Sequence, residues 1–237
     1  MPAAARSLRF AAFETSTDWC SVALWRDGEI SALEARAPTS HGELALPMLS
    51  RLLEDAGLRA ADLDAIAFGA GPGAFTGLRL ACSVAQGLAV GAGLPVLGIV
   101  SLEALALASG DGAVYACLDA RMNEVYCAAY RVAGETVAAV IAPVVAAPGQ
   151  VPVPPGEGWL GCGSGFAAYG AALAARLGPA IGGIDAQTRP RAAALLRMAA
   201  ARFMRGEGED AALATPLYVR DKVAMTTRER IAQGGKA

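Results

Sequence analysis

The chain has 237 residues, enough to bury a core as one large domain or as two smaller ones without a disulfide or a metal. Lys and Arg number 20 against 22 Asp and Glu, and the resulting net charge of −2 argues against a protein that binds nucleic acid on its own. The single histidine, His41, excludes any mechanism that needs two imidazoles, and the five cysteines include no CxxC pair.

The first half of the chain has the pattern of an α/β unit. Three apolar runs of strand length come first, then an amphipathic helical stretch, then two strand–helix pairs. Pro47 fits best in the first turn of a helix that begins between about His41 and Leu46, and Gly57 is expected to end that helix. We expect strands at 8–13, 20–25, 30–35, 64–70 and 95–100, and helices at 41–56, 76–92 and 101–108.

The second half repeats the start of the first. Glu14 and Asp119 each end a predicted strand, and in both halves the next strand opens six residues later. We expect three strands within 113–141, an extended Pro-rich loop at 142–158, a strand and a helix within 159–178, and an Arg-bearing helix at 191–205. The repeat predicts a duplicated actin/hexokinase/Hsp70-like (ribonuclease H-like) α/β fold. Its subdomains are placed at 1–110 and 111–225, with a disordered tail at 226–237.

The stretch GAGPGAFTGLRLACSVAQGLA, residues 69–89, suggests either phosphate binding or helix packing. It lacks the lysine of a phosphate-binding P-loop, and only the generic affinity of a helix N-terminus for anions remains. The helix that follows carries Arg79, Ser83 and Gln86 on one polar stripe, and its other residues are apolar or small. We therefore favour packing against a partner helix, with room left by its small residues Ala81, Ala85, Gly87, Ala89 and Gly91.

The two acids at equivalent turns allow a second hypothesis. Glu14 and Asp119 could face each other across a cleft and align Mg²⁺ with a nucleotide, as in an ATPase or kinase. They could equally be turn residues that remain from a nucleotide-binding ancestor. A serine or cysteine hydrolase is disfavoured, because no GxSxG motif accompanies His41, which we expect to be a helix-start residue.

Taken together, these motifs resemble the TsaB (YeaZ) family, whose members take part in threonylcarbamoyl modification of adenosine 37 in tRNA. The resemblance spans residues 14 to 224. Its segments are ETSTDWCSVALWRDGEI, ALPML, GPGAFTGLRLACSVAQGLA, DARMNEVY and PLYVRDKVA. The chain departs from the family pattern at Glu14, where Asp is common, and at Ala74, where Ser is common. Both departures count against nucleotide binding.

The resemblance implies a noncatalytic paralogue of TsaD. Ser101 and Leu105 stand where TsaD carries the two histidines of its HxEGH metal motif, so neither a resident metal nor a required cofactor is expected. It also implies a scaffold that binds TsaD and is joined by TsaE, with ATP and Mg²⁺ acting through those two proteins. A cytoplasmic location without membrane contact is expected from the sequence itself, because no apolar stretch follows the N-terminal arginines and the apolar run 86–108 is interrupted by glycines, a proline and a glutamate. Alone, the chain would pair with a second copy, and tRNA would be the substrate of the complex. The expected interface residues are Leu46, Met48, Thr76, Arg79, Ser83, Ala85, Gln86 and Gly87.

Overall fold

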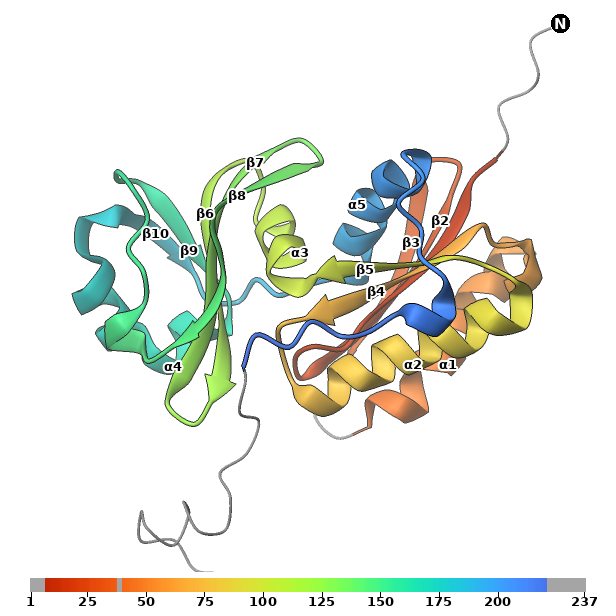
Figure 1. The fold of residues 1–237 in the computed structure, drawn as a ribbon, viewed down its shortest axis with the longest axis horizontal. Helices are drawn as coiled ribbons and strands as arrows, with labels where there is room; N and C mark the ends of the chain where they lie inside the picture. The colour runs from red at the N-terminus through yellow and green to blue at the C-terminus, as the bar shows by residue number, and fades with distance from the viewer. Residues whose placement is uncertain (1–6, 38–39, 221–237) are drawn as a thin grey trace, which may run out of the picture.

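The structure, a computed structural model, describes residues 7–37 and 40–220. Two α/β halves lie side by side, each built on one five-stranded mixed sheet (Figure 1). The strand order is β3-β2-β1-β4-β5 in the first sheet and β10-β9-β6-β7-β8 in the second. Read from β8 to β10, the second sheet repeats the first: three antiparallel strands followed by two parallel ones. The predicted duplicated actin-like fold is therefore confirmed.

The elements of the first half lie where the sequence predicts them. They are β1 (Arg9–Glu14), β2 (Trp19–Arg26), β3 (Glu29–Arg36), α1 (His41–Ala56), β4 (Ala65–Gly71), α2 (Phe75–Ala92), β5 (Val96–Val100) and α3 (Ser101–Ala108). Gly57 ends α1 in the left-handed conformation, with φ 65°. Pro47 lies in the second turn of α1 and not in the first, on the exposed side of the helix, where water can satisfy the carbonyl that its missing amide leaves free.

The second half differs from the prediction at two places. Its elements are β6 (Gly112–Arg121), β7 (Glu124–Ala133), β8 (Thr136–Ala146), β9 (Trp159–Cys162), α4 (Ser164–Leu177), β10 (Ile181–Asp185) and α5 (Ala192–Met204). β8 extends to Ala146, so the predicted loop at 142–158 begins too early. β10 was not predicted, because its two central glycines hide a strand that is formed by pairing with β9.

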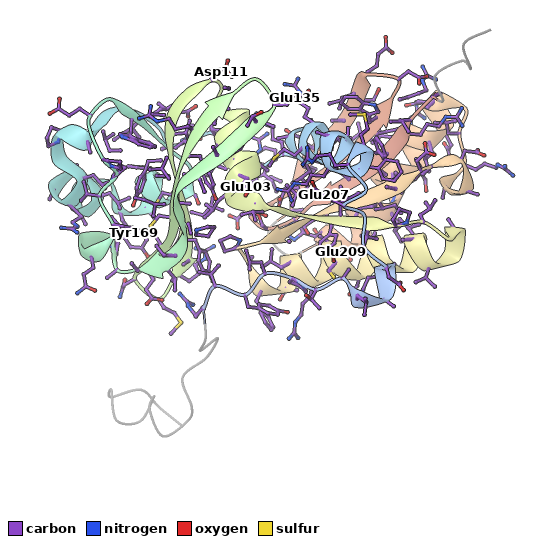
Figure 2. All side chains as sticks on the ribbon, turned by 45° about the horizontal axis from the view of Figure 1, so that its top comes forward. Glu103, Asp111, Glu135, Tyr169, Glu207 and Glu209 are labelled. Carbon is purple, nitrogen blue, oxygen red and sulfur yellow. The ribbon has the colours of Figure 1, made fainter. Side chains whose placement is uncertain are left out.

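α3 and α5 join the halves through one continuous core. Phe10 of the first sheet, Tyr130 of the second, Leu105 of α3 and Leu195 of α5 belong to the same buried cluster. The predicted boundary near 109–112 falls between α3 and β6, but α5 follows that boundary in sequence and packs on the first sheet (Figure 1). Figure 2 shows Glu103 of α3 in this central region, where it pairs with Arg202 of α5 at 2.9 Å. The predicted tail at 226–237 lies outside the described residues.

Candidate functional site

The loop before α2 packs directly on the turn that leaves β1. Gly69, Gly73 and Gly77 are spaced by four residues, and a Cβ on any of them would overlap an atom of that turn. The overlapped residues are, in the same order, Glu14, Ser16 and Thr15. The Thr15 hydroxyl also donates to the Gly77 carbonyl at 2.7 Å. These glycines allow two backbone segments of the same chain to approach closely, which is a different role from the predicted packing against a partner helix.

Glu14 is buried and does not line the cleft. Its carboxylate accepts hydrogen bonds from the Ser16 amide at 2.6 Å and from the Ser101 hydroxyl at 2.9 Å. Burial raises the pKa of Glu14 above its usual range, and these hydrogen bonds offset the rise only in part. The prediction that Glu14 and Asp119 face each other as paired carboxylates is therefore wrong, because the Glu14 side chain turns into the core.

A cavity of about 790 Å³ separates the two halves. The turn after β1 and the start of α2 line it from the first half, and the β6–β7 hairpin and the start of α4 line it from the second. The segment 217–220 also lines it. Its charged lining residues are Asp18, Arg36, Asp119, Arg121, Arg189 and Arg220.

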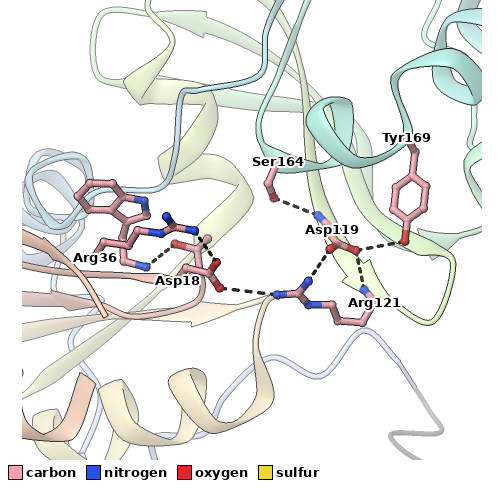
Figure 3. Close-up of polar contacts among 8 residues, drawn as sticks. Asp18, Arg36, Asp119, Arg121, Ser164 and Tyr169 are labelled. Atoms are coloured by element: carbon pink, nitrogen blue, oxygen red, sulfur yellow. Dashed lines mark hydrogen bonds and ion pairs between the residues drawn. The ribbon is translucent and has the colours of Figure 1, made fainter. Parts of the chain in front are cut away.

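Every carboxylate in this cavity already has a cationic partner. Asp119 pairs with Arg121 at 3.1 Å and also accepts hydrogen bonds from the Arg121 amide and from Tyr169 (Figure 3). Asp18, which the sequence analysis did not single out, lies between Arg121 at 3.7 Å and Arg36 at 3.9 Å. A Mg²⁺ ion bound by these acids would have to displace arginines. In 7–37 and 40–220, no three His, Cys, Asp or Glu side chains form a group that could hold a metal ion.

The two positions that correspond to the TsaD histidines are both buried. Ser101, at the start of α3, donates to Glu14, and Leu105, one turn later, is part of the central core. Neither a hydroxyl already hydrogen-bonded in the core nor an aliphatic side chain supplies the ligand that an imidazole would.

The outer face of α1 and α2 presents most of the predicted interface residues. Leu46, Thr76, Arg79, Ser83 and Gly87 are exposed, and Met48 is half-buried. Gln86 is half-buried as well, and its amide donates to the carbonyls of Ala211 and Ala214, so its side chain is engaged within the chain.

The prediction that Ala85 belongs to the interface is wrong, because Ala85 is buried. Its side chain is 0% exposed and belongs to the core under α2, together with Ala81 and Ala89. The sequence predicts that these alanines, like Gly87 and Gly91, leave room for a partner helix. In the structure the helical period places the alanines toward the sheet and the glycines toward solvent. α2 is long and apolar enough to cross a membrane by composition alone, yet this alanine face packs on the sheet.

Apolar residues that the sequence analysis missed extend the outer face. Val90 is 67% exposed on α2, and Leu213 is 72% exposed in the segment after α5. Phe75 and Tyr218 are also exposed and pack against each other beside Arg79. The exposure of Val90 could have been predicted from the sequence, because Val90 lies three residues after Gly87 and therefore on the same side of the helix as the glycines.

Three of the four arginines at residues 191–205, in and beside α5, are paired with glutamates. Arg191, Arg202 and Arg205 form ion pairs with Glu34, Glu103 and Glu207. In the described part of the chain, Arg197 alone of the four has no such partner. This arrangement favours a solvated, internally paired helix face over an RNA-binding one.

Comparison with known proteins gives consistent matches over nearly the whole chain. A family model described as TsaD, tRNA N6-adenosine threonylcarbamoyltransferase, matches residues 35–228. The tRNA threonylcarbamoyladenosine biosynthesis protein TsaB of Escherichia coli (strain K12) is 36% identical over 230 residues, which cover 92% of this chain and 96% of that protein. The protein of the same name from Haemophilus influenzae is 46% identical over 125 residues, covering 51% of this chain and 53% of that one. The solved structure of YeaZ from Pseudomonas aeruginosa is 38% identical, with a TM-score of 0.82, over 89% of this chain and 99% of that one.

Proposed function

The chain belongs to the TsaB (YeaZ) family of tRNA threonylcarbamoyladenosine biosynthesis proteins, which is related to TsaD, and from this premise we propose its role. It is a noncatalytic subunit of the complex that modifies adenosine 37, and it binds and stabilises TsaD. The outer face of α1 and α2 is the contact surface, and TsaE joins the assembled pair. The protein acts in the cytoplasm.

The observation that carries this proposal is the exposure of three large apolar side chains on this half of the molecule: Leu46 of α1, Val90 of α2 and Leu213 after α5. Gly87 and Gly91 lie on the same side of α2, and a Cβ on either would meet nothing within 4 Å. Glycine inside a helix costs about 1 kcal/mol relative to alanine, and no described residue of this chain approaches these two positions closely enough to require it. A second helix that approaches closely would use both the exposed apolar side chains and the room that the glycines leave.

The proposed absence of catalysis rests on the residues of the cavity and its surroundings. Glu14 is buried under Gly69, Asp119 and Asp18 are paired with arginines, and Ser101 is hydrogen-bonded in the core. ATP and Mg²⁺ are therefore required by TsaD and TsaE rather than by this chain, and tRNA is the substrate of the whole complex. Without TsaD, the same outer face pairs two copies of this chain.

Two surface variants test the interface. Val90→Glu replaces an exposed apolar side chain of α2 by a charge, and Arg197→Glu reverses a charge on α5, on a different part of the first half. We expect Val90→Glu to abolish co-elution with TsaD in gel filtration while its circular dichroism matches the wild type. Arg197→Glu should co-elute normally. Equal co-elution of both variants would contradict the proposed surface.

A dropout reconstitution tests the role. The reaction contains tRNA, threonine, bicarbonate, ATP, the threonylcarbamoyl-adenylate synthase, TsaD and TsaE, and modified adenosine is measured by mass spectrometry. We expect modification to depend on this protein and to survive the double change Glu14→Gln with Asp119→Asn. If the double variant assembles but stops modification, the carboxylates act in the chemistry and the Mg-nucleotide hypothesis replaces this one.

A further inference from the structure

The segment after α5 runs along the first half and then passes to the second (Figure 1), and its residues 217–220 line the cavity. We propose that its last described part, residues 217–220, here called the strap, is a latch that ties the first half to the β6–β7 hairpin of the second half across the cavity. Arg220 is the residue that fastens it.

The strap is anchored to the first half at two points. The Leu217 amide donates to the carbonyl of Ala70, at the end of β4, at 2.7 Å. Tyr218 accepts a hydrogen bond from Arg79 at 3.2 Å, and its ring lies 5.7 Å from that of Phe75 at the start of α2. The strap is therefore fixed to both β4 and α2.

Arg220 anchors the strap to the second half. One of its terminal nitrogens donates to the Ala120 carbonyl at 3.1 Å and also pairs with Glu124, and the other lies 3.6 Å from the Met122 sulfur. These contacts reach both strands of the β6–β7 hairpin. Its tip holds Arg121, Met122 and Asn123 in succession at φ between 54° and 60°, a conformation that residues other than glycine rarely adopt. The contacts of Arg220 thus stabilise the unusual backbone conformation of the β6–β7 turn and also fix the position of this turn relative to the strap.

A second contact also spans the cavity, but it is weaker. Asp18 of the first half and Arg121 of the second lie 3.7 Å apart, and their side chains are 46% and 75% exposed. Exposed ion pairs of this length contribute little, because water screens them and both side chains lose freedom. The Arg220 side chain is only 14% exposed and has several partners, so the strap rather than the Asp18–Arg121 pair is the main tie across the cavity.

The segment between β10 and α5 also lines the cavity, through residues 186–189. Within it, Arg189 pairs with Glu34 at 2.7 Å and stacks over Trp19 at 3.7 Å. Release of the strap would leave these contacts in place.

Hydrogen exchange on the full-length protein tests the latch. The variant is Arg220→Ala, the matched control is Arg197→Ala, and the comparison variant is Asp18→Asn. We expect Arg220→Ala to speed exchange of the Leu217 amide and of the β6–β7 hairpin amides by about fivefold or more. Exchange in the buried strands β1 and β4 should be unchanged. Arg197→Ala and Asp18→Asn should match the wild type at all these amides.

Two results would overturn the proposal. Unchanged hairpin exchange in Arg220→Ala would show that the strap does not hold the halves together. An effect of Asp18→Asn as large as that of Arg220→Ala would assign the tie to the ion pair. If Arg220→Ala does not fold, Arg220→Lys retains the charge opposite Glu124 but loses the forked geometry, and the same two criteria apply to it. The measurement needs no partner protein, so its failure is separate from a failure of the proposed scaffold role.

Discussion

The carboxylate of Glu14 occupies the place that a side chain on Gly69 would need. An ideal Cβ built on Gly69 would overlap the Glu14 carboxylate, which the Ser16 amide and the Ser101 hydroxyl hold in position. The acid at the end of β1 is thus directed into the protein and not toward the cavity. Because the Glu14 carboxylate is held in the core, it cannot serve a nucleotide site in the cavity.

Gly69→Ala should destabilise the protein by about 1–3 kcal/mol, because the added methyl group must displace a buried, hydrogen-bonded carboxylate. The measurement is urea unfolding of the two proteins. Gly87→Ala is the matched control, since a Cβ there meets open space and alanine favours the helix by up to about 1 kcal/mol. Similar unfolding midpoints for the two variants would show that Gly69 is not needed for close packing.

Glu14→Gln should change how stability depends on pH. Burial raises the pKa of Glu14, so the folded state keeps a proton that the unfolded state releases above its ordinary value of 4.5. The folded state then binds more protons, and the stability of the wild type falls as pH rises above 4.5 toward the raised pKa. Glutamine cannot ionise, so the variant should gain stability over the wild type between about pH 5 and about pH 8. The measurement is the free energy of unfolding in urea of wild type and variant at both pH values. If the variant differs from the wild type by the same amount at about pH 5 and at about pH 8, the pKa of Glu14 is not raised.

His41 should make the protein less stable as the pH falls, which is the opposite of the effect of Glu14. Burial lowers the pKa of His41, although the backbone carbonyls of Thr17 and Trp19 and the charge of Asp18 offset this in part. The unfolded state therefore takes up a proton first, and stability is lost as pH falls below the ordinary value of 6.5 toward the lowered pKa. His41→Gln should remove this loss, as measured by urea unfolding at about pH 7.5 and about pH 5.5. If wild type and variant lose stability equally on acidification, His41 is not the group responsible.

Ala85→Glu should leave little folded protein, because it places a charge in the core under α2. Val90→Glu, five residues later on the outer side, should fold normally and fail only in binding TsaD. Soluble yield and circular dichroism distinguish the two variants before any binding measurement. A well-folded Ala85→Glu would mean that α2 faces the sheet differently from this structure.

The sequence by itself determined the duplicated α/β fold. Glu14 ends β1 and Asp119 lies near the end of β6, the equivalent strand, and their spacing from the next strand, together with the apolar runs, can be read from the sequence alone. It also indicated that residues 69–77 do not form a P-loop, because the lysine of a phosphate loop is missing. β10 escaped notice because its two glycines carry no strand preference, and only pairing with β9 forms it.

Only the tertiary structure decided which way each side chain faces. Glu14 could point into a cleft or into the core with the same sequence, and the approach of Gly69 and Ser101 from distant elements settles its direction. Ala85 and Gly87 look alike as small residues, but the position of the sheet buries one and leaves the other open. The contacts of Arg220 with the β6–β7 hairpin join residues about a hundred positions apart, and no local pattern records such a pairing.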